Sequence, residues 1–542
     1  MANNSAVQNA SQALWDSERQ RDFDVVIVGS GHNALVAAGY LAQAGRSVLV
    51  LEKNDYLGGA TTSQRIFPDY DARLSRYAYL ISLLPTQIMT DLSLDFTTRR
   101  RRVASYTPWQ TPAGQERGLL LWNDSAEKSR ASLRELSGDD SAWQGYQRLM
   151  ELEAAIAELA WPTMLQPLQH RDTFRQQLRT ATQKRAWDAF VEQPLGCILE
   201  ELIQDDLLRG LLMTDGKIGV FSHPHDPSLL QNRCFLYHVI GGGTGEWRVP
   251  VGGMQAMVQA LVDRCHVLGV RCLAEAPARH IQVGTRTHEV SFDYQGQTLT
   301  VQAKRVLINA GPRTFAKLLG ESYAPQATDE GSVIKMNMLL RRLPQVKAPG
   351  VSPEDAFCGS LHLDEGYQQM LRSYAVTSNG EMPLEPPCEV YCHTLTDNSI
   401  LSPELAAQGY HTLTLFGLDM PYRLFEHDHD ARKLQVRELY LDALERMCSE
   451  SFRDCLALDR DGRPCIELKT PQDLEREVDL DLGNIFHNTL SWFFTDDAAQ
   501  VGQWGVETQY AGIYRAGSAA ARGGAVSGIP GYNAARCVLQ QW

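Results

Sequence analysis

The sequence contains few cysteines and no long apolar run. Its 542 residues include 11 cysteines, and no two of these form a Cys-x-x-Cys pair. This argues against a disulfide framework and against a zinc site, so we expect no metal centre and interpret the cysteines as free thiols. No stretch approaches the roughly 18 consecutive apolar residues that a membrane-spanning helix needs. We therefore expect a cytoplasmic protein without a transmembrane segment.

Basic residues are in the minority. The 51 lysines and arginines are outnumbered by 65 aspartates and glutamates, which gives a net charge of −14. An acidic surface repels phosphate backbones, so we expect no nucleic-acid partner, while a local patch leaves peripheral contact with a membrane open. The arginine run at residues 99–102 is interpreted as a solvated strand end. Residues 1–21 lack the basic and apolar regions of a secretory signal, and we predict a polar N-terminal extension.

The first positive signal is a strand-turn-helix-strand pattern. Residues 24–28 form an apolar, β-branched run that is typical of a strand buried on both faces. The segment Gly29-Ser-Gly-His-Asn-Ala34 follows, and helical apolar spacing begins at Leu35. A second apolar strand at residues 47–51 ends in Glu52. This order predicts a dinucleotide-binding βαβ unit.

Each residue of this motif has a physical role in nucleotide binding. Gly29 permits a tight turn, Gly31 lets the backbone approach a pyrophosphate, and Ala34 keeps the helix close to the strand. The helix N-terminus offers unpaired N–H groups and the positive end of its dipole to the phosphates. Glu52 is placed to accept hydrogen bonds from ribose hydroxyls and would repel a 2′-phosphate, which argues against NADP.

A glycine pair follows shortly after Glu52. It lies in Lys53-Asn-Asp-Tyr-Leu-Gly58-Gly59-Ala60-Thr61-Thr62. Two adjacent glycines let the chain double back over the pyrophosphate a second time, and a long dinucleotide such as FAD would benefit from that contact. A structural turn without a ligand is the alternative interpretation of any Gly-Gly pair.

Two further glycine-rich segments lie in the middle and at the end of the chain. Between the three segments the pattern predicts hairpins at residues 99–122 and 289–303, a mostly helical region at 126–215, a helix at 255–268 and a buried strand at 305–308. We therefore predict an α/β fold in which a Rossmann-like FAD-binding domain is interleaved with a mixed α+β substrate domain. The FAD-binding domain would comprise residues 22–90, 241–330 and 470–542, and the substrate domain residues 91–240 and 331–469.

These motifs together resemble a known family. Residues 24–62 are similar to the phytoene dehydrogenase-related flavoproteins, which include carotenoid desaturases, carotene ketolases and the pyridine nucleotide-disulphide oxidoreductase domain-containing protein 2 group. Further similar stretches are Phe235–Gly242 with Pro250–Met254, Gly483–His487, and Gly517–Ala535. The similarity covers nearly the whole chain and is greatest to the last of these groups. It implies a flavin amine oxidase-like architecture and non-covalent FAD.

The resemblance also implies which residues contact the cofactor. Those near the pyrophosphate, the ribose and the ribityl chain would be Gly29, Ser30, Gly31, Asn33, Ala34, Glu52, Lys53, Gly58, Gly59, Ala60 and Thr61. Those near the adenine, the second pyrophosphate contact and the flavin would be Ala278, Ala310, Gly311, Gly517, Ser518, Ala525, Val526 and Ser527. The last three would begin a helix whose N–H groups face the flavin C2 carbonyl, where they stabilise negative charge on the reduced ring.

Three residues are candidates for catalysis. His238 and His487 lie in segments that match the family, and either could accept a proton, although a lone histidine is more often structural. Many relatives carry His-Pro where this chain has Ala521-Arg522. We hypothesise that Arg522 pairs with an anionic substrate group or with the reduced flavin, the alternative being a solvated turn arginine. The aromatic residues Trp492–Phe494 could wall an apolar cavity or belong to the core.

The sequence thus predicts an FAD-dependent oxidoreductase. The expected reaction is dehydrogenation of a small, largely apolar or amphiphilic substrate, with hydride transfer to flavin N5. Oxidation of a C–N bond, as in an amine oxidase, is the enzymatic alternative. A flavin-binding regulatory or partner-binding protein is the alternative from another class. No second independent Gly-x-Gly-x-x-Gly unit is present, so reduction by NAD(P)H is not expected.

Overall fold

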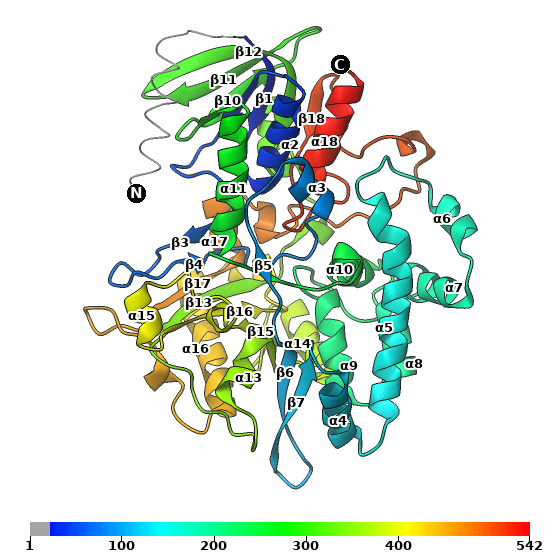
Figure 1. Cartoon of the computed structure of the whole chain (residues 1–542), viewed down its shortest axis with the longest axis vertical. Coiled ribbons are helices and arrows are strands. Elements are labelled where there is room, and N and C mark those ends of the chain that lie inside the picture. The colour runs from blue at the N-terminus through cyan, green and yellow to red at the C-terminus, as the bar shows by residue number, and fades with distance from the viewer. Residues whose placement is uncertain (1–21) are drawn as a thin grey trace.

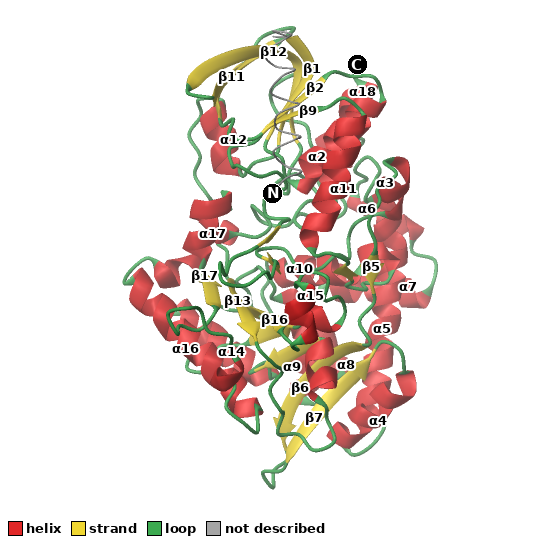
Figure 2. Cartoon of the chain, turned by 60° about the vertical axis from the view of Figure 1, so that its left-hand side comes forward, coloured by secondary structure: helices red, strands yellow, loops and turns green. Residues whose placement is uncertain are grey.

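The computed structural model describes residues 22–542, and the predicted N-terminal extension at residues 1–21 lies outside them. Two seven-stranded sheets organise the chain, one above the other in Figures 1 and 2. The predicted α/β class is confirmed. None of the helices in the described part is long and apolar enough to cross a membrane. All eleven cysteines are free, and all but Cys197 and Cys272 are buried.

The first sheet has the strand order β10-β11-β12-β1-β2-β9, with β18 paired to β12. Its strands are β1 (Asp22–Val28), β2 (Val48–Leu51), β9 (Arg271–Leu273), β10 (Ala278–Gln282), β11 (His288–Tyr294), β12 (Gln297–Ile308) and β18 (Ile513–Arg515). Strand β1 runs parallel to both β2 and β12, and residues 25–27 are fully buried. Burial on both faces explains why these strands are continuously apolar instead of alternating.

Strand β12 differs from its prediction. A hairpin at 289–303 and a separate strand at 305–308 were expected, but the structure has one strand of twelve residues. Its first half pairs antiparallel with β11, and its second half pairs parallel with β1 and β18. The strand therefore continues from an outer hairpin into the centre of the sheet.

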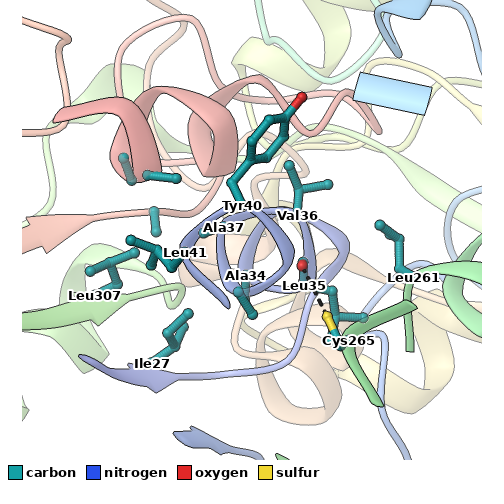
Figure 3. Packing of buried hydrophobic residues seen from close by; sticks show 14 of the residues in the cluster. Ile27, Ala34, Leu35, Val36, Ala37, Tyr40, Leu41, Leu261, Cys265 and Leu307 are labelled. Atoms are coloured by element: carbon teal, nitrogen blue, oxygen red, sulfur yellow. Dashed lines mark hydrogen bonds between the residues drawn. The ribbon is translucent and has the colours of Figure 1, made fainter. Parts of the chain in front are cut away.

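Helices pack on the first sheet and hold its centre together. They are α2 (His32–Gln43), α3 (Thr86–Asp91), α11 (Met254–Val267), α12 (Pro312–Leu318) and α18 (Ile529–Gln540). Helix α17 (Pro471–Val478) instead contacts β17 (Ile466–Lys469) of the second sheet. Figure 3 shows α2 surrounded by apolar side chains of α11 and both central strands, with the Cys265 thiol donating to the Leu35 carbonyl at 3.3 Å. Helix α18 approaches α2 closely, since a Cβ at Gly531 would lie 1.9 Å from the Asn33 carbonyl oxygen.

The second sheet has the order β17-β13-β16-β15-β14-β6-β7. Its strands are β6 (Val103–Gln110), β7 (Glu116–Trp122), β13 (Ile334–Leu340), β14 (Ser360–Leu363), β15 (Cys388–Tyr391), β16 (His411–Gly417) and β17 (Ile466–Lys469). Helices α13 (Pro353–Cys358), α14 (Tyr367–Ser378), α15 (Pro403–Ala407) and α16 (His429–Met447) lie beside it. The hairpin predicted at 99–122 corresponds to β6 and β7.

Between β7 and the later strands of the second sheet, the chain forms a helical layer. It contains α4 (Ala126–Ser137), α5 (Ser141–Ala160), α6 (Arg171–Gln177), α7 (Ala181–Trp187), α8 (Leu195–Leu202), α9 (Asp206–Met213) and α10 (Leu230–Val239). Short two-stranded pairs join the layers: β3 (Ser63–Gln64) with β4 (Leu74–Ser75), and β5 (Thr98–Arg99) with β8 (Val249–Pro250). The division of the chain into two interleaved domains, with the boundaries given above, stays a prediction.

Candidate active site

A cavity begins where β1 passes into α2. Gly29 has φ +87°, and Gly31 is the N-cap of α2, with no side chain capping the helix. The first N–H groups of this twelve-residue helix therefore lack intrahelical and side-chain partners. Gly31, His32 and Asn33 all line the cavity. A helix N-terminus of this kind favours a bound anion such as a phosphate.

Glu52 is held at the rim of this turn. Its Oε2 accepts hydrogen bonds from the Ser30 amide at 2.9 Å and the Ser30 hydroxyl at 2.6 Å. Its Oε1 accepts one from the Asn54 amide at 2.9 Å. These three bonds fix the carboxylate, which lines the cavity and is 4 % exposed. The side chain is thereby oriented before any ligand binds.

The glycine pair passes over the helix N-terminus, as its sequence position predicts. The Gly58 amide donates to the Ser30 carbonyl at 3.1 Å, and Gly58 forms a bridge with Gly31. Gly58 has φ +114° and Gly59 φ +58°, and a Cβ on Gly59 would lie 3.4 Å from the Gly31 Cα. The chain can double back this closely because neither residue has a side chain.

From this turn the cavity extends to residues of the second sheet. Its volume is about 540 Å³, within the usual range for ligand sites. Most of the predicted cofactor residues line it: Gly29, Ser30, Gly31, Asn33, Glu52, Lys53, Gly58, Gly59, Ala60, Thr61, Ala278, Ala310, Gly311, Ser518, Ala525 and Val526. The structure thus brings together segments that are far apart in the sequence.

Three predicted cofactor residues do not line the cavity. Ala34 is buried within α2, and Gly517 packs against Asn309, where a Cβ would lie 2.7 Å from the Asn309 Oδ1. Ala525, Val526 and Ser527 were expected to begin a helix facing the flavin. Instead α18 begins at Ile529 after Gly528, whose φ of +70° turns the chain, and the Ser527 hydroxyl accepts from the Ile529 amide at 3.2 Å.

Several buried polar atoms at the cavity have no hydrogen-bond partner among residues 22–542. They are His32 Nε2, Asn33 Oδ1 and His487 Nδ1. His32 Nδ1 is paired with the Thr61 hydroxyl at 2.9 Å. Burial lowers the pKa of both His32 and His487 to about 4, so both rings are neutral near pH 7. Unsatisfied buried groups of this kind are rare in proteins and are expected where a ligand completes the site.

His238 also lines the cavity, and its tautomer follows from its contacts. Its Nδ1 lies 2.8 Å from the Cys234 carbonyl oxygen, which can only accept, so Nδ1 carries the proton. Nε2 is therefore the nitrogen with the free lone pair. The ring stacks on Trp247 at 5.4 Å between centroids. The arrangement leaves His238 able to accept a proton within the cavity.

Arg522 lies away from the cavity, in contrast to its prediction. Its guanidinium donates to the carbonyls of Thr163 at 2.9 Å, Gln166 at 2.5 Å and Trp504 at 2.9 Å. The residue is 1 % exposed. Because these carbonyls occupy the guanidinium, the structure gives it neither a path to a substrate nor the solvated position of a turn arginine.

The aromatic residues at 492–494 are core residues. Phe493 and Phe494 pack with Phe174 and Trp187, and none of the three residues at 492–494 lines the cavity. The wall includes Tyr79, which follows the glycine pair and is a candidate from the sequence, and six side chains that sequence analysis missed: Leu80, Ile218, Tyr237, Trp247, Tyr391 and Phe416. These residues belong to loops and strands of both layers that meet at the cavity.

Lys335 is a further residue that sequence analysis missed. It lines the cavity, and its Nζ donates to the carbonyls of Ser75 at 2.5 Å and Tyr77 at 2.6 Å. Nζ also lies 4.7 Å from the centre of the Tyr79 ring. Burial lowers the pKa of Lys335 well below its usual range. A lysine inside the mostly apolar segment of β13 was a detectable signal, since lysine is seldom fully buried.

The part of the cavity near the second sheet is polar. Arg101, Asp215, Ser360 and Glu389 line it. Burial raises the pKa of Asp215 and raises that of Glu389 to about 8. No group of three His, Cys, Asp or Glu side chains that could hold a metal ion was found within residues 22–542. This end therefore combines one permanent cation with two carboxyl groups whose proton affinity is increased.

Comparisons with known proteins give a consistent result. Residues 27–87 match the family model of the NAD(P)-binding Rossmann-like domain. An uncharacterized protein of Mycobacterium tuberculosis is 40% identical over 96% of this chain and 98% of its own. Pyridine nucleotide-disulfide oxidoreductase domain-containing protein 2 of Rattus norvegicus is 30% identical over 96% of this chain and 94% of its own. A putrescine oxidase variant has a similar fold, with a TM-score of 0.55 and 18% identity over 96% of this chain and 100% of its own.

Proposed function

Because the chain belongs to the family of pyridine nucleotide-disulfide oxidoreductase domain-containing protein 2, we propose that it is an oxidoreductase that binds FAD without a covalent bond. The observation that carries this proposal is the continuity of the cavity. It runs from the uncapped N-terminus of α2 and the fixed carboxylate of Glu52 to a wall of aromatic and aliphatic side chains. The first part has the chemistry to bind a dinucleotide, and the second is lined by side chains that suit an apolar substrate.

The residues at the α2 end fit FAD. The free N–H groups of residues 31–33 would bind the pyrophosphate, and Gly58 and Gly59 would cover it from the other side. Glu52 would accept hydrogen bonds from the ribose of the adenosine. The unpartnered atoms of His32 and His487 supply polar contacts that an empty apolar cavity would not need.

When bound, FAD would accept a hydride at N5. This chain's residues would hold the substrate and manage the proton. Tyr79, Ile218 and Phe416 present apolar surface that excludes water from the reacting bond. His238 would take the proton through its Nε2. We favour His238 over His487 because the low pKa of His487 makes that ring a weak base. Of the reactions that hydride transfer to N5 allows, we propose dehydrogenation of a C–C bond.

The test is the absorbance spectrum of the purified protein, followed anaerobically as candidate substrates are added. The panel contains a polyene, a long-chain amine and amphiphilic acids. Flavin bands that bleach with the polyene or an acid support C–C dehydrogenation, whereas bleaching by the amine alone would replace it with C–N oxidation. Bands that bleach with no compound of a broad panel would favour a flavin-binding module. A protein without flavin bands, even after reconstitution with FAD, would refute the proposal.

A pair of histidine variants tests the proton acceptor. His238→Gln should retain the flavin spectrum but slow bleaching by about 100-fold or more, the usual loss when a general base is removed. His266→Gln is the matched control, because His266 is exposed on α11. Equal bleaching rates in both variants would remove His238 from the mechanism.

A further inference from the structure

The arginine run at residues 99–102 is not uniform in the structure. Arg99, Arg100 and Arg102 are about half exposed, and each forms an ion pair with a carboxylate, namely Asp397, Glu246 and Asp355 respectively. Arg101 is different: it is 8 % exposed and lines the cavity. The sequence interpretation of the run as a solvated strand end is therefore wrong for this residue. Its position just before β6 directs it inward, toward β14 and β15.

Arg101 has few partners for a buried cation. Its Nη1 donates to the Ser360 hydroxyl at 3.1 Å, and its guanidinium carbon lies 5.7 Å from the centre of the Tyr391 ring. Its Nε has no hydrogen-bond partner within residues 22–542. No carboxylate of that part of the chain approaches within ion-pair distance of the guanidinium. Burying a charge without a contacting counter-charge is costly, so such a group is expected where a ligand supplies the missing charge.

The neighbouring carboxyl groups do not supply it. Glu389 accepts a hydrogen bond from the Tyr391 hydroxyl at 2.5 Å and lies 3.8 Å from His362 Nδ1, and burial raises its pKa. Glu365 is paired with His362 at 2.6 Å. Asp215 lines the same end of the cavity and forms neither an ion pair nor a hydrogen bond with Arg101; burial raises its pKa, although the charge of Arg101 acts in the opposite direction. The guanidinium thus faces the cavity with its charge unmatched by contact.

We infer that the substrate of this enzyme carries a carboxylate, which pairs with Arg101 at the end of the cavity near the second sheet. The apolar remainder of the substrate would lie along Tyr79, Ile218 and Phe416. The substrate class is then an acidic amphiphile, not a neutral hydrocarbon or an amine. This inference rests on the proposed function in one respect, namely that this end of the cavity holds the substrate.

The experiment measures binding by isothermal titration calorimetry on the purified full-length protein with the flavin it carries. The probes are decanoate and decylammonium, each below its critical micelle concentration, and decan-1-ol below its solubility limit. Wild type should bind decanoate more tightly than the other two. Arg101→Gln should weaken decanoate binding by about 10- to 100-fold, as expected for loss of a charged hydrogen bond, and should leave decan-1-ol binding unchanged.

Two further variants keep the test decisive. Arg102→Gln is the matched control in the same arginine run, and it should bind decanoate as wild type does. Asp215→Asn keeps Arg101 and removes a nearby carboxyl, so it should bind decanoate as tightly as wild type or more tightly. This variant is informative even if Arg101→Gln does not fold. Decylammonium binding more tightly than decanoate, and weakening in Asp215→Asn, would overturn the inference in favour of a cationic substrate.

The outcomes separate this inference from the proposed function. Calorimetry reports binding without any redox step. The protein could fail to bind flavin and still bind decanoate in a way that depends on Arg101. That result would refute the proposed function and support the anion site. Flavin that is reduced by a substrate, together with decanoate binding that is unaffected by Arg101→Gln, would support the function and overturn this inference.

Discussion

Replacing Arg522 by methionine should destabilise the segment that carries Ala525 and Val526 into the cavity. The guanidinium joins three parts of the chain, because it donates to carbonyls of Thr163, Gln166 and Trp504. Burial lowers the pKa of Arg522 to about 10, which still leaves it charged near pH 7. Methionine fills a similar length of space but donates no hydrogen bond, and three carbonyl oxygens would lose their partner.

The expected loss of stability is the difference between two opposing contributions to the free energy of unfolding. Three hydrogen bonds from a charged donor contribute about 1.5–3 kcal/mol each, and removing the buried cation recovers several kcal/mol of its desolvation cost. The difference between these two contributions leaves a net cost of about 3–5 kcal/mol. For a cooperative unit of about 250 residues, 1 kcal/mol shifts the Tm by roughly 2 °C, so the expected decrease is roughly 6–10 °C.

The assay is thermal unfolding of the wild type and variants, combined with hydrogen exchange of the segments around Thr163 and Trp504. Arg522→Lys should lose less stability than Arg522→Met, since it keeps the charge and some of the bonds. Arg233→Met is the matched control, because Arg233 is partly buried nearby and donates one backbone bond, to the Ser228 carbonyl at 3.3 Å. A variant Arg522→Met with unchanged Tm and altered turnover of carboxylate substrates would show that this reasoning is wrong.

Two more predictions concern the cavity. Gly29→Ala should abolish flavin retention, because a Cβ at φ +87° would lie 2.5 Å from the Asn309 carbonyl oxygen. Gly45→Ala, at φ +77° with no atom nearby, should lower the free energy of unfolding by about 1–2 kcal/mol and retain flavin. Equal flavin content in both variants would contradict the argument. Burial raises the pKa of Glu389 from 4.5 to about 8, so its protonated form stabilises the fold fully below pH 4.5, and this contribution is lost as the pH rises through 8. Relative to Glu389→Gln, the wild type should therefore lose about 2–4 kcal/mol between about pH 5 and 8, and a pH-independent difference in thermal unfolding would contradict this.

The features that sequence analysis predicted correctly are those fixed by local interactions. The path from β1 through the glycine turn to α2 and Glu52 depends on residues that lie within about thirty positions of one another. The glycine pair after Glu52 was informative for the same reason, since its positive φ values require residues without side chains.

The residues that were missed or misassigned depend on distant partners. Whether an arginine is solvated or buried is decided by what packs on it, and Arg101 meets Ser360, which is 259 positions away. Arg522 meets Thr163, 359 positions away, and its structural role is invisible in the local motif. Lys335 meets Ser75, 260 positions away, although its place in a mostly apolar strand was a local sign that it is unusual.

The pairing of β1 with β12 also constrains how the protein is made. About 280 residues separate Val28 from its partner Ile308, and α18, which packs on α2, lies near the end of the chain. At about 5–20 residues per second, a ribosome needs roughly 15–55 s to extend the chain from one of these strands to the other. During that time the apolar edge of β1 is exposed to other nascent chains. The glycine-rich turn between β1 and α2 is thus translated well before β12 and α18, the two elements that pack beside it in the folded chain.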